Sequence, residues 1–345
     1  MRKVSRCKLL KYLMPACLFG AFFLSACGSS EKIPYAKTGF YFDTVVTLTV
    51  YDTAKNADAA NALLDEAMEE CRRYDELFAP DLESSDIYRI NHAGGESVHV
   101  SDETATMLYS ALAYCRSFSG LADITIKPVK DLWDFTPQGG TIPSENSLSS
   151  ALSHVNYQNV DLTGNKVSIA DPYASIDPGF IAKGYIADQL KAFFISKNCP
   201  AAIINLGGNV QTLGTKPDQS DYSVGIRKPF GDADEYLTTI SLSDADTTYS
   251  SAATSGIYER CFTVSDTLYH HILNPSTGMP AETDLYSATI LTDSSMDADA
   301  LSTICLMMGS EAAADYIRSV DGVDAILITD KYEIIDTRSS KSNTP

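Results

Sequence analysis

The chain has 345 residues, enough for one large domain or two smaller ones, and a formal net charge of −19. Apolar residues make up 44% and charged residues 21%, which is ordinary for a globular protein. Because like charges repel, such an acidic chain is a poor partner for nucleic acid and for anionic lipid headgroups.

The first thirty residues have the layout of a secretory signal, with five basic residues before the apolar run "LMPACLFGAFFLSAC". The run ends in "LSAC", which resembles the lipobox of bacterial lipoproteins and implies cleavage before Cys27 and lipidation of its thiol. An ordinary secretory signal or an uncleaved anchor is the alternative. We predict a signal peptide at 1–26, a tether at 27–38, and an exported lipoprotein held by its acyl chains at the periplasmic or outer face of the membrane.

The cysteines remaining after such processing are odd in number and widely spaced, and no two of them form a C-x-x-C motif. This pattern argues against a disulfide framework and against a zinc site. We therefore expect most of them to be buried small apolar residues. They are Cys71, Cys115, Cys199, Cys261 and Cys305.

In the first half of the chain, the composition of 42–52 predicts a strand, and apolar residues at helical spacing predict a long amphipathic helix over 56–78. Segment 101–120 opens with Ser and Asp as candidate caps and closes on a glycine, which predicts a second helix. After a Gly/Pro/Ser-rich stretch we expect a short helix, strands at 167–170 and 174–177, and a helix from about 181 to 197.

In the second half, "AAIINLGG" reads as a buried strand that ends in a glycine pair, and "MDADALSTICLMMG" and "EAAADYIRSV" read as helices. "AILITD" reads as the final strand. Helices and strands mix without a regular β-α-β alternation, which favours an α+β fold over a doubly wound sheet. Further strands are expected at 222–228, 236–242, 248–251, 261–265 and 285–292.

The segment "SIDPGFIAKGY" (175–185) combines a strand end, a turn and a predicted helix start near Phe180. A helix start offers unpaired N–H groups to an anion such as phosphate, and Lys183 would add a positive charge. The alternative is an ordinary β-to-α turn with Asp177 as the helix N-cap. The segment's spacing favours neither reading over the other.

The pair Gly207–Gly208 in "NLGGNVQTLG" would allow a close approach of the backbone to a ligand, and it would equally serve a tight turn. The segment matches neither the G-x-G-x-x-G fingerprint nor a P-loop. In "YHHILNPSTGMP", a strand over 269–273 would point His270 and His271 to opposite faces, so only one of them could face a given site. A single strand histidine is more often structural than catalytic, and the turn beside this pair leaves both roles open.

The segment "MDADALST" places Asp299 and Thr303 one helical turn apart on one face of a predicted helix. A carboxylate and a hydroxyl are hard oxygen ligands, which suit Mg²⁺ better than zinc. The alternative is that Asp299 neutralises the helix N-terminus and Thr303 bonds back to a carbonyl.

Taken in order along the chain, these segments resemble the FAD:protein FMN transferases of the ApbE family, from about residue 40 to 330. The resemblance implies an ApbE-like, T-fold-related α+β domain over 39–337, with mainly antiparallel sheets and packed helices, and a disordered tail at 338–345. The blocks are "FDTVVTLTVYD", "SDIYRIN", "SGLADITIKPVKDLWDF", "IDPGFIAKGYIAD", "INLGGNVQTLG", "TSGIYER", "HILNPSTGMP" and "DADALST".

The resemblance implies that Asp299 and Thr303 are side-chain ligands of Mg²⁺ and that Phe180 supplies a backbone carbonyl as a third ligand. It also implies that His271, rather than His270, is the histidine implicated in catalysis. The residues implied to contact FAD are Phe42, Leu121, Ala122, Asp123, Asp177, Lys183, Gly207, Gly208 and Ile272.

The implied activity is the Mg²⁺-dependent transfer of FMN from FAD to a Thr or Ser hydroxyl of a target flavoprotein, typically a subunit of a membrane redox complex, with release of AMP. His271 would take or orient the acceptor proton. A Mg²⁺-dependent FAD pyrophosphatase and a non-enzymatic flavin-binding lipoprotein are the alternatives. The chain departs from the family pattern at Asn274, where Asp is usual, and at Phe42–Asp43, where Met-Gly is usual.

Overall fold

The computed structural model describes residues 34–51, 56–136, 140–232, 234–244 and 249–338. The expected signal peptide, the lipidation site Cys27 and residues 339–345 of the expected tail lie outside the described residues. The expected tether is wrong in its last part, because a strand already begins at Tyr35. Among the described residues, no helix is long and apolar enough to cross a membrane.

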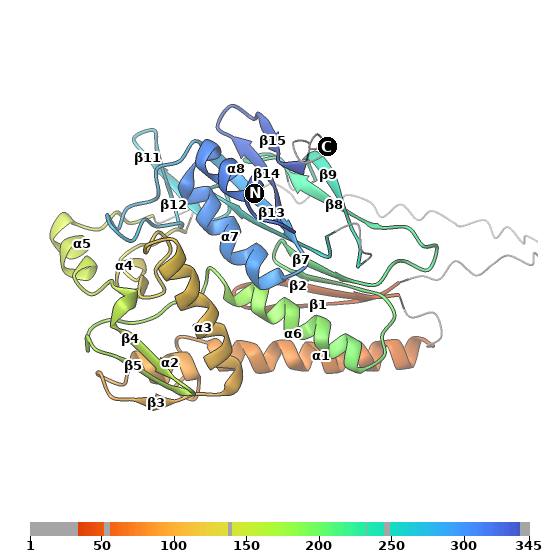
Figure 1. Cartoon of the computed structure of the whole chain (residues 1–345), viewed down its shortest axis with the longest axis horizontal. Helices are drawn as coiled ribbons and strands as arrows, with labels where there is room; N and C mark the ends of the chain where they lie inside the picture. The colour runs from red at the N-terminus through yellow and green to blue at the C-terminus, as the bar shows by residue number, and fades with distance from the viewer. Residues whose placement is uncertain (1–33, 52–55, 137–139, 233, 245–248, 339–345) are drawn as a thin grey trace, which may run out of the picture. The chain divides into compact units, whose positions relative to one another are not determined.

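The centre of the described chain is an eight-stranded sheet in which all neighbouring strands are antiparallel (Figure 1). This arrangement confirms the predicted α+β class with mainly antiparallel pairing. In spatial order the strands are β1 (Tyr35–Tyr41), β2 (Thr44–Val50), β6 (Ala202–Leu206), β7 (Asn209–Leu213), β10 (Ser251–Gly256), β13 (Leu285–Thr292), β14 (Asp324–Thr329) and β15 (Ile334–Asp336).

Four helices pack against strands of this sheet. Figure 1 shows α1 running beside β1 and β2, with α6 and α7 further along the sheet. A separate hairpin of β8 (Tyr222–Arg227) and β9 (Tyr236–Leu242) shares an apolar cluster with residues of β7, β10, β13 and β14. The helices are α1 (Ala57–Phe78), α6 (Ala182–Ser196), α7 (Ser295–Met308) and α8 (Ser310–Arg318).

Smaller elements complete the described fold. The sheet β3-β5-β4 is accompanied by α2, α3 and the short η1, and the hairpin β11–β12 shares an apolar cluster with α4 and α5. Their bounds are α2 (Asp86–Asn91), β3 (Val98–His99), α3 (Asp102–Ser117), α4 (Lys127–Lys130), α5 (Glu145–Leu152), η1 (Tyr157–Asn159), β4 (Val160–Thr163), β5 (Lys166–Ile169), β11 (Cys261–Val264) and β12 (Thr267–His270).

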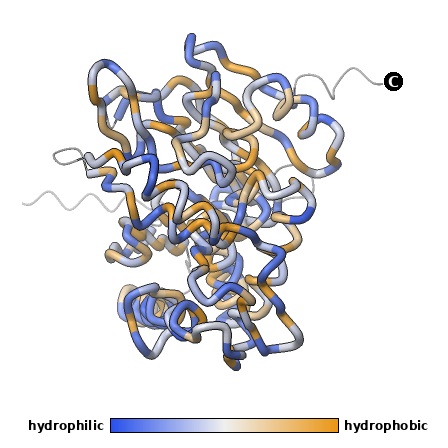
Figure 2. Tube along the Cα trace, turned by 90° about the vertical axis from the view of Figure 1, so that its left-hand side faces the viewer, coloured by the Kyte–Doolittle hydropathy of each residue, from blue (hydrophilic) through white to orange (hydrophobic). Residues whose placement is uncertain are grey.

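Local sequence explains α1, the longest of the described helices. The side chain of Asn56 accepts the N–H of Ala59 at 2.9 Å and so caps the first turn. Leu64 and Cys71 lie on the same face of the helix and are fully buried toward the sheet, while glutamates and arginines face solvent. Figure 2 shows the same mixing along the described residues, where apolar and polar residues follow one another closely. Amphipathic elements of this kind can be read from sequence.

Some predicted strands are wrong, and side-chain hydrogen bonds explain one of them. Residues 174–177 form only an isolated parallel bridge, from Ser175 to Ile126, because on their other side the amide of Asn91 accepts the N–H of Ile176 at 2.7 Å and donates to its carbonyl at 3.0 Å. This side chain takes the place of a neighbouring strand. The strand predicted at 248–251 is instead β10, which begins at Ser251, and the sequence reading missed β1 and β7.

The cysteines behave as predicted. No disulfide joins them among the described residues. Four are buried, and only Cys261 is half-buried. Burial raises the pKa of Cys71, Cys115 and Cys305 to about 12, so these thiols stay protonated at neutral pH.

Candidate active site

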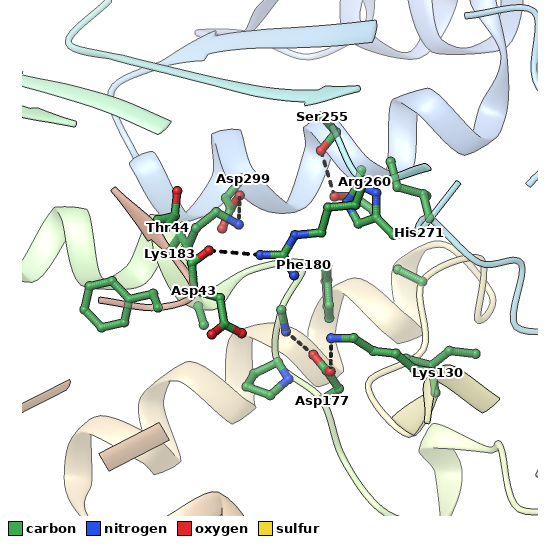
Figure 3. Close-up of a pocket in the computed structure, with 18 of the residues that line it drawn as sticks. Asp43, Thr44, Lys130, Asp177, Phe180, Lys183, Ser255, Arg260, His271 and Asp299 are labelled. Carbon is green, nitrogen blue, oxygen red and sulfur yellow. Dashed lines mark hydrogen bonds and ion pairs between the residues drawn. The ribbon is translucent and has the colours of Figure 1, made fainter. Parts of the chain in front are cut away.

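A cavity of about 700 Å³ brings together segments that are far apart in the sequence (Figure 3). It lies where the β1–β2 turn, the start of α6, the β6–β7 turn, the end of β10 and the middle of α7 meet. Leu121 and Gly208 are not among the residues that line it, although their neighbours are. The predicted site residues that line the cavity are Phe42, Ala122, Asp123, Asp177, Phe180, Lys183, Gly207, His271, Ile272, Asp299 and Thr303.

Asp299 is buried between α7 and the start of α6, with a side chain 7% exposed. Its Oδ2 accepts the N–H of Gly184 at 2.9 Å, and its Oδ1 lies 3.7 Å from the ammonium of Lys183. Burial raises the pKa of Asp299, although the Lys183 charge and the Gly184 N–H oppose this rise. The carboxylate therefore caps the neighbouring helix with one oxygen and keeps the other close to a single cation.

The same contact affects the carbonyl of Phe180. In a regular helix the N–H of Gly184 would bind the carbonyl four residues earlier, which is that of Phe180. Here this N–H binds Asp299 instead, because α6 begins only at Ala182. The Phe180 carbonyl, at the cavity wall, thus keeps its acceptor capacity for another partner.

Thr303 follows Asp299 by one turn of α7. Its hydroxyl is bonded to that of Ser255 at 3.0 Å, across to the end of β10. The back-bonding expected in the alternative reading is made by Ser302, whose hydroxyl donates to the Asp299 carbonyl at 2.8 Å. Thr303 therefore presents a hydroxyl at the cavity wall.

The donor set fits a hard divalent cation. A carboxylate, a hydroxyl and a backbone carbonyl supply oxygen atoms, and among the described residues the buried carboxylate has a single ammonium within 4 Å, that of Lys183 at 3.7 Å, to balance its charge. The described residues contain no group of three or more His, Cys, Asp or Glu side chains that could hold a metal ion. A site with one carboxylate and two neutral oxygens is consistent with that finding, since the aspartate is its only ligand from among His, Cys, Asp and Glu.

Asp177 does not cap α6 as the alternative reading expected, because the helix starts five residues later. One carboxylate oxygen accepts the N–H of Gly179 at 2.7 Å, and the other pairs with the ammonium of Lys130. Burial alone would raise the pKa of Asp177, but the charge and hydrogen bond of Lys130 and the N–H of Gly179 together outweigh it and hold this pKa below its usual range. Asp177 thus fixes the turn before α6 and holds Lys130 at the cavity (Figure 3).

Asp123 lines the cavity, but its carboxylate is fully engaged elsewhere. One oxygen accepts the N–H and the hydroxyl of Thr125, and the other accepts the N–H of Tyr157 at 2.9 Å. This carboxylate therefore shapes the loop that carries Ala122 and Asp123, and a ligand would meet the loop through its other atoms.

The strand predicted over 269–273 is wrong at its end, because β12 stops at His270, but only one of the two histidines lines the cavity, as expected. His270, at the end of β12, is 4% exposed, and its Nε2 lies 3.1 Å from the Ala281 carbonyl. His271 lines the cavity, and its N–H donates to the Arg260 carbonyl. Burial, together with the charges of Arg260 and Lys183, lowers the pKa of His271 to about 3. Its imidazole is neutral at pH 7, and its Nδ1 has no hydrogen-bond partner among the described residues.

The turn between β1 and β2 is strained. Phe42 and Asp43 have φ angles of 56° and 55°, values that favour glycine or asparagine and are unusual for a bulky side chain. The Phe42 N–H donates to Asp75 at 2.8 Å, and the Asp43 carbonyl accepts from Arg260 at 3.1 Å. These two bonds hold the Phe42–Asp43 turn, which replaces the usual Met-Gly, at the cavity wall.

The glycine pair of the β6–β7 turn is a two-residue hairpin connection. Gly207 and Gly208 have φ angles of 62° and 95°. A Cβ on Gly207 would lie 2.1 Å from the Thr44 hydroxyl oxygen, whereas one on Gly208 would meet nothing within 4 Å. Gly207 is therefore needed to bring this turn against β2 at the cavity, and Gly208 serves the turn itself.

Sequence reasoning missed two cations and one polar neighbour at the site. Lys130, Arg260 and Ser255 line the cavity, and all three lie in or beside segments already singled out by the family resemblance. Their signal was weak because a lysine or arginine in a loop is usually a surface residue. Asn274, the other departure, closes its own turn by accepting the N–H of Ser276 at 2.8 Å, as Asp would.

The sequence profile of the ApbE family matches residues 42–327, which span all the cavity segments. The chain belongs to the ApbE family. An FAD:protein FMN transferase of Klebsiella pneumoniae is 31% identical over 277 residues, covering 79% of this chain and 84% of that protein. One of Treponema pallidum is 28% identical over 323 residues, covering 88% and 87%.

Solved structures of the family have the same fold. The ApbE protein of Thermotoga maritima superposes with a TM-score of 0.78 at 29% identity, over 90% of this chain and 99% of that protein. This similarity confirms the predicted ApbE-like α+β architecture, and it covers the chain over nearly the whole described region.

Proposed function

We propose that this protein is an FAD:protein FMN transferase that moves FMN from FAD to a Thr or Ser hydroxyl of a target protein, with Mg²⁺ as its metal. Membership of the ApbE family and similarity to curated FAD:protein FMN transferases support the activity. The observation that carries the proposal is that His271, Asp299 and Thr303, from two separate segments, line one cavity together with three cationic side chains.

Asp299, Thr303 and the Phe180 carbonyl would hold the metal. When bound, Mg²⁺ neutralises charge on the diphosphate oxygens and stabilises the departing AMP. Ser255, through its bond to the Thr303 hydroxyl, would keep that oxygen turned toward the cavity.

The cations and His271 have separate tasks in this proposal. Lys130, Lys183 and Arg260 would bind the diphosphate of FAD, since ammonium and guanidinium groups suit phosphate oxygens. The acceptor oxygen forms a bond to the phosphorus of the FMN half, and the bond from that phosphorus to the bridging oxygen breaks. AMP leaves with the bridging oxygen, and the neutral imidazole of His271 accepts the acceptor proton. The diphosphate would raise the low pKa of His271 and so strengthen it as a base.

The test uses protein from Gly28 onward with FAD, Mg²⁺ and a flavin-acceptor domain that carries its threonine or that threonine replaced by alanine. We expect AMP release and a mass gain of FMN minus water on the threonine form alone, both stopped by EDTA. AMP and free FMN with an unmodified acceptor would instead indicate a pyrophosphatase. FAD binding without any AMP would indicate a carrier.

We further propose that Cys27 is lipidated and that the protein acts on targets at the outer side of the cell membrane, such as subunits of membrane redox complexes. The "LSAC" sequence at the end of the apolar run supports this proposal. Full-length protein expressed in bacteria should incorporate labelled palmitate and remain with membranes, and Cys27→Ala should do neither. Equal labelling of both forms would exclude Cys27 as the lipidation site.

A further inference from the structure

Within the part of the chain that the structure describes, the strand β1 forms one edge of the eight-stranded sheet and pairs only with β2. The β1–β2 connection has two residues, so Tyr41 and Thr44 form the hydrogen-bonded pair beside the turn. Because such pairs alternate along an antiparallel ladder, the backbone N–H and C=O groups of Ala36, Thr38 and Phe40 point away from β2. A second strand could bind to these groups.

The same edge carries an exposed apolar pair. Phe40 and Val45 face each other across β1 and β2, and they are 69% and 56% exposed. Directly opposed residues of this kind lie close together, so they form one apolar spot on the open face of the hairpin. Natural proteins usually protect an edge with proline or with charges. Pro34 precedes β1, and the ammonium of Lys37 within it is paired with Asp65 of α1, but the residues whose backbone groups point outward, Ala36, Thr38 and Phe40, carry neither device.

This edge leads directly to the candidate active site. The turn that follows Phe40 lines the cavity, and its Asp43 carbonyl accepts a hydrogen bond from Arg260. The Arg260 carbonyl in turn accepts the N–H of His271 at 3.1 Å. A chain bound along β1 and continuing past the turn would therefore arrive at the cavity that His271 lines.

We propose that the acceptor polypeptide binds as an added strand on the outer edge of β1, with Phe40 and Val45 contacting its side chains. This inference rests on the proposed function, because that reaction requires a Thr or Ser of another protein to enter the cavity. An extended segment suits the task, since backbone hydrogen bonds hold it independently of sequence and place its hydroxyl at a defined distance along the strand. The occupant is an extended segment of the flavin-accepting protein.

Two variants test the edge without touching the metal or flavin residues. Thr38→Pro removes an N–H that points away from β2, which an edge strand tolerates, and an exposed hydroxyl bonded to that of Thr47 at 3.2 Å. Phe40→Lys replaces the apolar contact with a charge. Ile195→Lys is the matched control, because Ile195 is 54% exposed on the last turn of α6 and does not line the cavity.

The probe is the acceptor domain on which the wild-type protein transfers FMN. We expect kcat/KM for that domain to fall at least tenfold in both edge variants, while the Kd for FAD and the Tm stay near the wild-type values. The control should match the wild type throughout. A benzoylphenylalanine placed at position 40 should cross-link to the acceptor, and one placed at position 195 should not.

Transfer within twofold of the wild type in Phe40→Lys would overturn the inference, whether or not Thr38→Pro folds. So would a wild-type dimer that Phe40→Lys dissociates without loss of transfer, because the edge would then bind a second copy. Absence of transfer by the wild type would overturn the proposed function itself, which keeps the two failures distinct.

Discussion

At the scale of single residues, His271 shows how position sets chemistry. The adjacent His270 has the same side chain, but it is buried away from the cavity with its Nε2 beside a backbone carbonyl. His270 is the last residue of β12, whereas His271 lies just beyond it and lines the cavity, where burial beside two cations makes its imidazole neutral at pH 7.

We therefore predict that His271 of the protein without FAD and metal stays neutral between pH 5 and pH 9. Its folded pKa, about 3, lies below the ordinary value near 6.5, so protonation should begin only well below pH 5. Long-range ¹⁵N NMR of the imidazoles, with His271→Ala to assign the signal, measures this pKa. A midpoint near 6.5 would contradict the burial argument.

Asp299 has two tasks, and its substitution should affect both. Asp299→Ala removes the only carboxylate of the proposed metal set and the cap on Gly184. We expect FMN transfer to fall at least a thousandfold at any Mg²⁺ concentration, and the free energy of unfolding to fall by about 1–2 kcal/mol from the lost cap.

A steady-state assay across Mg²⁺ concentrations and a denaturant titration measure these two effects. Asp315→Ala is the control, since Asp315 is an exposed acidic residue of α8 paired with Arg318. Normal FMN transfer by Asp299→Ala in the presence of EDTA would contradict the proposal that Asp299 binds a metal ion needed for the reaction.

At the scale of elements, the contact between α6 and α7 builds the side of the cavity that carries the proposed metal ligands. A Cβ on Gly184 would lie 2.2 Å from the Ser295 carbonyl oxygen and 2.7 Å from the Cβ of Asp299. Asp188 of α6 accepts the N–H groups of Ser295 and Met296 at the start of α7, which fixes that helix from the other side. The two helices therefore place Asp299 only when they pack this closely.

The variant Gly184→Ala tests which of two opposite effects on stability is larger, the gain in helix propensity or the loss from overpacking. Propensity alone would stabilise a helix by about 1 kcal/mol, but overpacking should destabilise the protein by about 1–3 kcal/mol. We expect a net loss of stability and a higher Mg²⁺ concentration for half-maximal transfer, measured by denaturation and by metal titration. Gln189→Ala, on the same helix, is the control. Increased stability with unchanged metal dependence would mean that α6 and α7 can move apart freely.

The carboxylate of Asp86 joins the start of α2 to the start of α3. This buried carboxylate accepts the N–H and hydroxyl of Ser101 and the hydroxyl of Thr104, and it pairs with Arg89. Burial alone would raise the pKa of Asp86, but these bonds outweigh it and lower the pKa below its ordinary value.

The stability that Asp86 contributes should therefore be complete above its unfolded pKa of about 4 and lost as the pH falls through the lower folded pKa. We expect Asp86→Asn to reduce the free energy of unfolding by about 1–3 kcal/mol at pH 7, because it leaves buried partners unsatisfied. At pH 3 the difference from the wild type should shrink. Urea titrations at both pH values measure it, and an equal loss at both would argue against a role for the charge.

At the scale of the whole molecule, the cysteines test the compactness of the domain. In protein from Gly28 onward we predict that all five thiols are reduced and that at most Cys261, the half-buried one, reacts quickly with Ellman's reagent. The unfolded protein should react at all five. A Tm that falls on addition of reductant would contradict this prediction, because it would reveal a disulfide.

Much of the fold was predictable because it depends on local patterns. Apolar spacing located α1 and α7, and caps such as Ser101 marked helix starts. The strand predictions were less reliable, since a strand is stabilised by a neighbouring strand that can be far away in the sequence. Residues 174–177 have strand composition, but the amide of Asn91 binds their backbone in place of a strand.

The sequence by itself determined the fold class, the family and eleven of the residues that line the cavity, because the motifs occur in order and their chemistry suits a metal and a diphosphate. Only the tertiary structure decided how they combine. It places Lys130 on Asp177 and Arg260 against the strained β1–β2 turn, and it binds Asp299 to the start of α6. These contacts join residues far apart in the chain, so no local pattern encodes them, and they form only when the helices pack on the sheet.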